Sequence, residues 1–320
     1  YASIDYFEYQ SLYYTTYLNE FSFPFFEGGM GTTGKEFVWA TVSSFFYHSG
    51  FSFPVWVFFI ALVSITIKFY FFKKYSKYFL LTIAIYITQS FIKDMGQLRN
   101  GLAGAILLFS VAPILKRDVI KFVLVVVMAF GVQAYAIIAL PLYWLYPLFL
   151  RMKYSLIFIL LALSVLSFSG GVAELIMSKI GLSGLVHDRM LHKLEGYSEV
   201  EVDKLSITSF TGATYTLIMI VLLYYKGKIH ATFPLLSIFS LFHFYGVSLF
   251  LLFTGMQTIN VRSLDLFSMT ALPFLLVTPM LFSKGVSKFV FFILIIVFCT
   301  LRFYANMGAL SPYNTIFGIL

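Results

Sequence analysis

Residues 51–72 read FSFPVWVFFIALVSITIKFYFF and carry one charged side chain, Lys68. A helix needs about 20 consecutive apolar residues to cross roughly 30 Å of hydrocarbon, so this stretch is long enough for one span. Helices and closed barrels are the only structures that can span lipid. Because the apolar run is continuous and lacks the alternation of a barrel strand, it predicts a transmembrane helix and an all-α fold.

Runs of the same kind recur along the chain, at 78–94, 98–115, 154–177, 207–225, 230–254, 261–282 and 286–305. The stretch 119–150 is long enough for two short helices broken near Gly131. Residues 37–50 are apolar but too few for a span, which indicates an interfacial or re-entrant segment. The sequence therefore predicts one integral membrane domain over residues 1–320, a polytopic helical bundle of about ten membrane segments.

The composition supports this class. Hydrophobic residues make up 60% of the chain and charged residues 11%, whereas soluble domains carry about 25% charged residues. The net charge of +8 does not indicate nucleic-acid binding, because the basic residues form short clusters between spans. The single cysteine, Cys299, excludes an intramolecular disulfide within this sequence. The chain begins at Tyr1 rather than Met, and we expect a preceding segment such as another span.

The basic clusters predict the orientation of the spans. If the spans alternate, 13 basic residues fall on one side: Lys68, Lys73, Lys74, Lys77, Lys116, Arg117, Lys121, Arg151, Lys153, Lys226, Lys228, Lys284 and Lys288. The positive-inside rule makes that side cytoplasmic. Of the 14 acidic residues only Asp118 lies there. The other acidic residues lie on the outer side. That side includes residues 1–50 and a long loop at 178–206.

Four arginines are expected at outer span ends: Arg99, Arg189, Arg262 and Arg302. Such a side chain can snorkel to the lipid headgroups, and snorkelling or structural pairing suits Arg302 best. Arg99 and Arg262 instead open patterned helices. A helix N-terminus offers free N–H groups and a partial positive charge, so a guanidinium group placed there predicts a phosphate site.

Two carboxylates are candidates for a general base, Glu36 and Asp5. His187 begins a His-Asp-Arg sequence, but adjacent residues rarely point at a common centre. His243 lies mid-span, where a hydrogen-bonded core histidine is more common than a proton relay. Zinc-protease, nucleophile-elbow, P-loop and dinucleotide-binding patterns are all absent from the sequence, so we expect neither a metal nor another cofactor.

Four segments together resemble the EpsG family of bacterial exopolysaccharide proteins, which is related to the Wzy O-antigen polymerases. They are Asp5-Tyr6 with Tyr9 and Tyr13-Tyr14, then Lys35-Glu36-Phe37, then Leu98-Arg99-Asn100-Gly101-Leu102-Ala103, and finally Arg262 at the start of a late span. One position departs from the family, which usually has a histidine after the segment at 129–130. This chain has Gln133 there, and we take it as structural or substrate-positioning.

The resemblance implies a C-type glycosyltransferase-like fold in the bacterial inner (cytoplasmic) membrane. The implied substrates are a glycan donor and a glycan acceptor, both linked to undecaprenyl pyrophosphate, and the implied reaction takes place on the periplasmic or outer face. Membrane lipid surrounds the chain, and a chain-length regulator protein is an expected partner.

Polymerisation by such an enzyme needs a base for the acceptor hydroxyl and cations for the leaving pyrophosphate. We expect Arg99 and Arg262 to bind pyrophosphate, with Arg189 completing the clamp, and Glu36 or else Asp5 to act as base. Five aromatic residues are expected to stack on sugars: Tyr6, Tyr9, Tyr13, Tyr14 and Trp39. His187, Arg302 and Gln133 are further candidates. Direct attack by the acceptor inverts the anomeric carbon, and guanidinium groups serve in place of a divalent cation.

Three other functions stay open. A flippase or transporter of lipid-linked glycans predicts inverted repeats and charges near the membrane midplane, and the sequence shows neither convincingly. A ligase that joins the glycan to another acceptor is hardly separable from a polymerase by sequence. A non-catalytic scaffold is disfavoured by the isolated arginines.

Overall fold

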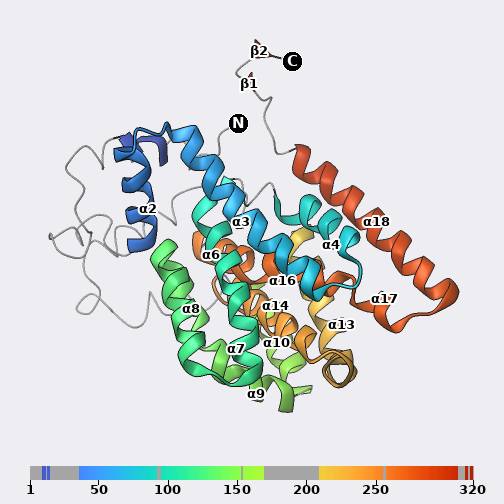
Figure 1. Ribbon diagram of the computed structural model, residues 1–320. Coiled ribbons are helices and arrows are strands. Elements are labelled where there is room, and N and C mark those ends of the chain that lie inside the picture. Colours follow the sequence, from blue (N-terminus) through green and yellow to red (C-terminus); the bar gives the residue numbers. More distant parts are fainter. Residues whose placement is uncertain are drawn as a thin grey trace. The chain divides into compact units, whose positions relative to one another are not determined.

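The structure is a computed structural model that describes residues 9–11, 13–14, 36–91, 94, 96–152, 154–168, 209–254, 257–308, 314–315 and 318–319. These residues are mainly helical (Figure 1), with one antiparallel pair of two-residue strands, β1 (Asn314–Thr315) and β2 (Gly318–Ile319). The chain folds into two compact units. The first comprises Tyr1–Leu140 and Leu272–Leu320, and the second Pro141–Ala271. The expected helical fold is confirmed, and the single membrane domain stays a prediction.

The first unit contains these helices: α2 (Phe37–His48), α3 (Phe53–Tyr75), α4 (Phe79–Tyr86), π-helix η2 (Ile87–Phe91), α6 (Leu98–Leu107), 3-10 helix η3 (Leu108–Ser110), α7 (Val111–Lys116), α8 (Val119–Val132), 3-10 helix η4 (Ala134–Ala139), α17 (Thr278–Phe282) and α18 (Gly285–Gly308). Helix α6 packs against α3 and α8, and α2 lies on α8. Leu81 and Ile85 of α4 pack against Met280 and Ile295 at the C-terminal end of the chain.

Local sequence explains where two of these helices begin. Pro54 lies in the first turn of α3, where its missing N–H costs no helical hydrogen bond. Asp118 caps α8, because its Oδ1 accepts a hydrogen bond from the backbone N–H of Lys121 at 3.1 Å. The break in 119–150 is confirmed, but it lies at Gln133 rather than at Gly131, since α8 continues through the glycine.

The second unit contains α9 (Leu142–Arg151), α10 (Tyr154–Phe168), α13 (Phe210–Thr232), α14 (Pro234–Leu252), α15 (Gln257–Ser263) and π-helix η6 (Leu264–Met269). The chain passes from the second unit to the first within α16 (Thr270–Leu276). Helix α14 packs against α13, α9, α10 and η6. His243 of α14 is fully buried and its Nε2 lies 3.1 Å from the carbonyl oxygen of Tyr215, which confirms the core histidine.

Five helices of the described residues are long and apolar enough to cross a membrane: Phe53–Tyr75, Leu98–Lys116, Ala134–Arg151, Pro234–Leu252 and Gly285–Tyr304. A sixth span results if Ile259–Ser268 and Thr270–Phe282, bent by 48°, are counted together. The chain is thus a helical membrane protein, with fewer full-length spans in its described part than the sequence predicts. The apolar helices at 79–91 and 119–132 are shorter than the about 20 residues of a span, and the predicted span 154–177 is described only as far as residue 168.

Two lysines expected among the basic residues of the cytoplasmic side are buried among the helices. Lys68 belongs to α3 and is 4% exposed. Lys226 belongs to α13, where it is buried and donates hydrogen bonds to the carbonyl oxygens of Phe149 and Met152 at the end of α9. The predicted connection at 226–228 was wrong, because α13 continues to Thr232. No local pattern reveals the burial of either ammonium group, since its partner comes from a distant part of the chain.

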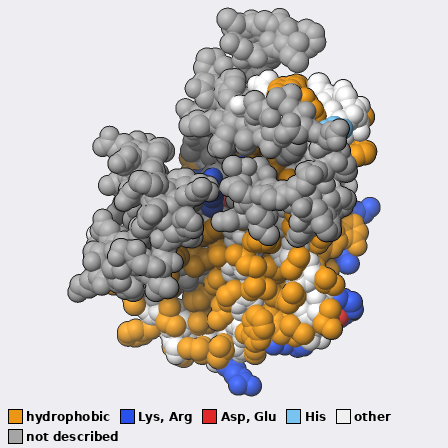
Figure 2. All heavy atoms as spheres, turned by 90° about the vertical axis from the view of Figure 1, so that its left-hand side faces the viewer, with side chains coloured by type: hydrophobic (Ala, Val, Ile, Leu, Met, Phe, Trp, Pro, Cys, Tyr) orange, Lys and Arg blue, Asp and Glu red, His pale blue; other side chains and the backbone are white. Residues whose placement is uncertain are grey.

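The described surface is strongly apolar, as lipid contact requires. Figure 2 shows one face on which the described side chains are mainly hydrophobic, with lysine and arginine side chains at its rim. Helix α18 is the most exposed of the candidate spans, with 17% of its apolar window buried. Its large exposed side chains include Val286, Phe289, Leu294, Leu301 and Tyr304.

Candidate functional site

The most polar contact at the start of α6 is an ion pair between two predicted site residues. Nη1 of Arg99 donates a hydrogen bond of 2.5 Å to Oε2 of Glu36, 63 positions earlier in the chain. The two side chains are 23% and 17% exposed. The structure therefore brings together the first-choice base and one of the predicted pyrophosphate ligands, and it leaves the pair accessible to a substrate.

The backbone beyond α8 holds the other oxygen of the same carboxylate. Oε1 of Glu36 accepts a hydrogen bond of 3.1 Å from the backbone N–H of Ala134. This N–H is exposed to the carboxylate because α8 stops at the buried Gln133, whose extended backbone (φ −140°, ψ 110°) turns the chain into η4. Gln133 thus serves the site through the turn it occupies, in keeping with the predicted structural role.

A glycine allows α2 to approach this break. A Cβ atom added at Gly131 would lie 2.6 Å from Cγ2 of Val38 and 2.7 Å from Cε1 of Phe37. Both distances are far below van der Waals contact, so only glycine permits the observed packing of α2 on α8. Since Glu36 immediately precedes α2, this close approach determines where its carboxylate lies.

Two aromatic rings surround the guanidinium group of Arg99. Its Nε donates to the hydroxyl oxygen of Tyr9 at 3.2 Å, and its Cζ lies 4.7 Å from the centre of the Tyr9 ring and 5.8 Å from that of Trp39. Cations are attracted to ring faces at such distances. Within the described part of the chain, Nη2 of Arg99 has no hydrogen-bond acceptor, so this nitrogen can donate to a ligand.

The neighbouring aromatic residues form a buried cluster rather than an open platform. Tyr9, Tyr13 and Trp39 are buried, and Trp39 packs edge-on against Trp56 with ring centres 4.7 Å apart. Tyr14 is 43% exposed. In this structure Tyr9 and Trp39 orient Arg99, and their predicted stacking on sugars stays a prediction, as does that of Tyr13 and Tyr14.

The helix start itself contributes donors. Arg99 is in the first turn of α6, and the preceding Gln97 makes no side-chain capping bond. The first backbone N–H groups of a helix have no intrahelical partner. Together with the guanidinium group they favour an anion at this end of α6.

The other predicted site residues are distributed as follows. Arg302 is buried, and its Nε donates to Oε1 of Gln89 at 3.0 Å, which confirms structural pairing. Arg262 is half-buried on α15 of the second unit, so its joint action with Arg99 stays a prediction. The remaining four lie outside the described residues: Asp5, Tyr6, His187 and Arg189.

Among the described residues, no three His, Cys, Asp or Glu side chains converge as metal ligands would. Sequence reasoning missed the Ala134 N–H and the close approach at Gly131. A glycine two residues before Gln133, the position that departs from the expected histidine, was the available signal for both.

Comparison with known proteins gives one match. The model of the EpsG family matches residues 1–315. No curated protein and no solved structure matches the chain.

Proposed function

The chain belongs to the EpsG family, and from this premise we propose that it polymerises glycan repeats linked to undecaprenyl pyrophosphate. Family membership and the apolar helices already indicate a polysaccharide polymerase-type membrane protein with glycosyltransferase-like activity. The substrate, the C-type glycosyltransferase-like fold with about ten membrane segments, the membrane face and the mechanism are our proposal. The Glu36–Arg99 pair at the start of α6 is the observation that carries it.

The pair supplies the two groups that this transfer needs. The acceptor hydroxyl attacks the anomeric carbon of the donor chain, and the bond from that carbon to the pyrophosphate oxygen breaks. The hydroxyl proton passes to the Glu36 carboxylate. Undecaprenyl pyrophosphate leaves with the bonding electrons, and Arg99 stabilises its negative charge, assisted by Arg262 and Arg189. A single displacement of this kind inverts the anomeric configuration.

The geometry also couples donor binding to the base. Glu36 uses Oε2 for Arg99 and Oε1 for the Ala134 N–H. A pyrophosphate group competes with Oε2 for the guanidinium donors, because phosphate oxygens accept charge-assisted hydrogen bonds from arginine. Its binding releases Oε2 to receive the acceptor proton, while the bond from Ala134 keeps the carboxylate in place. Glu36 is therefore activated only when a donor is present.

The decisive experiment is polymerisation of purified lipid-linked repeats by the protein in detergent. Glu36→Gln keeps the size of the side chain but cannot accept the proton, so the rate should fall by about 10²–10⁴-fold while donor binding persists. Arg99→Lys keeps the charge but loses the planar fork. Wild-type polymer ladders from both variants, at normal protein level, would show that this pair is not the catalytic centre.

The length of the 98–116 helix supports the proposed active face. This span has 19 residues, close to the roughly 30 Å of hydrocarbon at about 1.5 Å per residue. Arg99 and Lys116 therefore lie at opposite membrane faces. With Lys116 on the cytoplasmic side by the positive-inside rule, Arg99 faces the periplasm or exterior of the inner membrane.

A second candidate function is flipping of the lipid-linked glycan, because the structure contains an ion pair, Lys68–Asp94, whose side chains are only 4% and 13% exposed and whose lysine lies in the apolar helix α3. The detergent assay separates the two functions. In detergent there are no two membrane faces between which a flippase could move its substrate, so a flippase gives no product. A polymerase gives a ladder of chain lengths. A ligase would instead give a single capped product on its own acceptor.

A further inference from the structure

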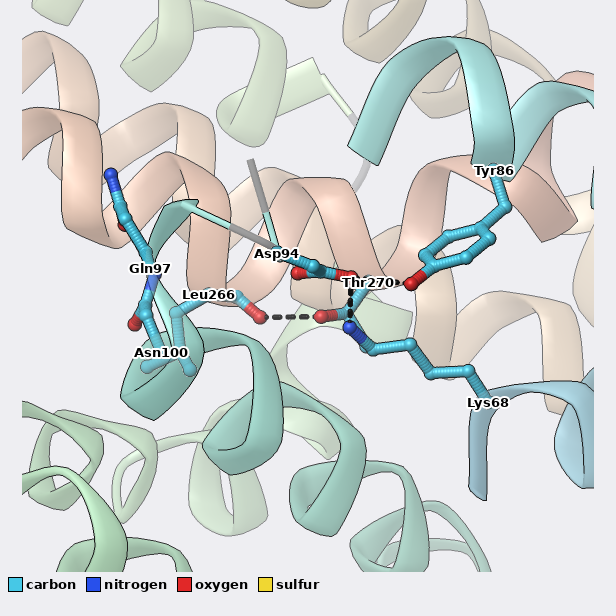
Figure 3. A network of polar contacts seen from close by, with 7 residues as sticks. All are labelled: Lys68, Tyr86, Asp94, Gln97, Asn100, Leu266 and Thr270. Carbon is cyan, nitrogen blue, oxygen red and sulfur yellow. Dashed lines mark hydrogen bonds and ion pairs between the residues drawn. The ribbon is translucent and has the colours of Figure 1, made fainter. Parts of the chain in front are cut away.

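Three helices of the first unit meet at a buried charged network outside the Glu36–Arg99 pair (Figure 3). Nζ of Lys68 on α3 donates to Oδ2 of Asp94, and the hydroxyl group of Tyr86 on α4 donates to the same oxygen at 2.8 Å. The ammonium group also lies 5.4 Å from the centre of the Tyr86 ring. In Figure 3 the side chains of Lys68 and Tyr86 point toward the carboxylate of Asp94.

The same aspartate touches the first turns of α6. A Cβ atom added at Gly101 would lie 3.0 Å from Oδ1 of Asp94 and 3.3 Å from its Cα. The carboxylate therefore packs closely against α6 at Gly101, where an added methyl group would require Asp94 to shift by a few tenths of an ångström. Gly101 is two residues after Arg99, and Asp94 is five residues before it.

We infer that Asp94 is a positioning residue, which fixes the first turn of α6 and thereby aims Arg99 at its phosphate ligand. The inference rests on the proposed function and adds residues to its site. Lys68 and Tyr86 hold the carboxylate from α3 and α4, and the carboxylate packs closely against α6 at Gly101. Because side chains point outward at 100° intervals along a helix, a turn of its first residues re-aims the guanidinium group.

Stability alone does not account for this network. Removing two charges from water is costly, and replacing a buried ion pair by apolar residues of similar volume is often neutral or stabilising. An ion pair that lies among apolar helices is therefore better explained by the geometry that it imposes on them. That geometry bears on the candidate site because Asp94 lies five residues before Arg99 in the chain.

The first test replaces the pair by apolar side chains of similar size, Lys68→Met with Asp94→Leu. The double variant should reach normal protein level, because no unpaired buried charge remains. Its polymerisation rate per molecule should fall about 100-fold, the effect of an ångström-scale misplacement of a catalytic group. A wild-type rate from the double variant would overturn the inference.

The second test leaves every charge in place. Gly101→Ala forces the Asp94 carboxylate to shift by a few tenths of an ångström, so the rate should fall at normal protein level. Gly227→Ala is the matched control, because its added Cβ has no atom within 4 Å. A Gly101→Ala protein as active as Gly227→Ala would also overturn the inference.

The third test separates this inference from the proposed function. If Asp94 acts through Arg99, adding Arg99→Lys to Lys68→Met/Asp94→Leu should cost much less than the product of the separate losses. Multiplicative losses would mean independent roles and would refute positioning through Arg99. If Arg99→Lys alone keeps the wild-type rate, the proposed function itself fails. If it loses activity while the Asp94 variants do not, only the positioning role fails.

Discussion

Gly131→Ala is the substitution whose effect on the site is most directly set by the structure. The new Cβ would lie 2.6 Å from Cγ2 of Val38 and 2.7 Å from Cε1 of Phe37. Carbon atoms pack at about 3.5–4.0 Å, so Phe37 and Val38 at the start of α2 must give way by about 1 Å, and we expect α2 to move with them. Overpacking of this kind costs typically about 1–3 kcal/mol of stability.

The movement reaches the candidate base. Glu36 is joined directly to Phe37, and its Oε1 lies 3.1 Å from the Ala134 nitrogen. A displacement of about 1 Å lengthens this bond beyond hydrogen-bonding range. Since a misplacement of that size costs about 100-fold in rate, polymer synthesis should fall far more than protein level.

The assay compares chain-length ladders, membrane protein level and thermal stability of Gly131→Ala with those of Gly227→Ala. Adding Val38→Ala to Gly131→Ala removes the nearest clashing atom and should restore part of the rate. A Gly131→Ala protein with wild-type ladders would refute the reasoning, because it would mean that the bond between Glu36 and Ala134 does not position the carboxylate.

Further predictions concern the arginines, the orientation and the metal requirement. Arg99→Lys and Arg262→Lys should insert normally yet lose about 10²–10³-fold in rate, since each loses one fixed electrostatic contact, whereas Arg302→Lys should keep most of its activity per molecule. In a Cys299→Ser background, an impermeant thiol reagent added outside should label Ser49→Cys and not Lys77→Cys, and the reverse result would invert the active face. Excess chelator should leave polymerisation of purified repeats unchanged, and a loss restored by magnesium or manganese would contradict guanidinium catalysis.

Local patterns were sufficient to predict the class of protein and to single out Arg99 as a candidate site residue. Apolar runs near the length of a bilayer determine helices wherever they lie, because every backbone polar group must be satisfied within lipid. Arg99 was recognisable because small residues follow it at the start of a helix. By the same local reasoning Lys68 and Lys226 were expected among the solvated basic residues of the cytoplasmic side, because a lysine near the end of an apolar run is normally solvated.

What the sequence by itself determined is the helical membrane fold, the positions of most helix breaks and the two groups with the right chemistry, Glu36 and Arg99. Only the tertiary structure decided that these two groups meet, across 63 residues, and that the Ala134 N–H holds the carboxylate from 98 residues away. The physical reason is that such contacts depend on how closely two helices approach. That distance is set by the missing side chain of Gly131 facing Phe37 and Val38, a match between surfaces that no local pattern contains.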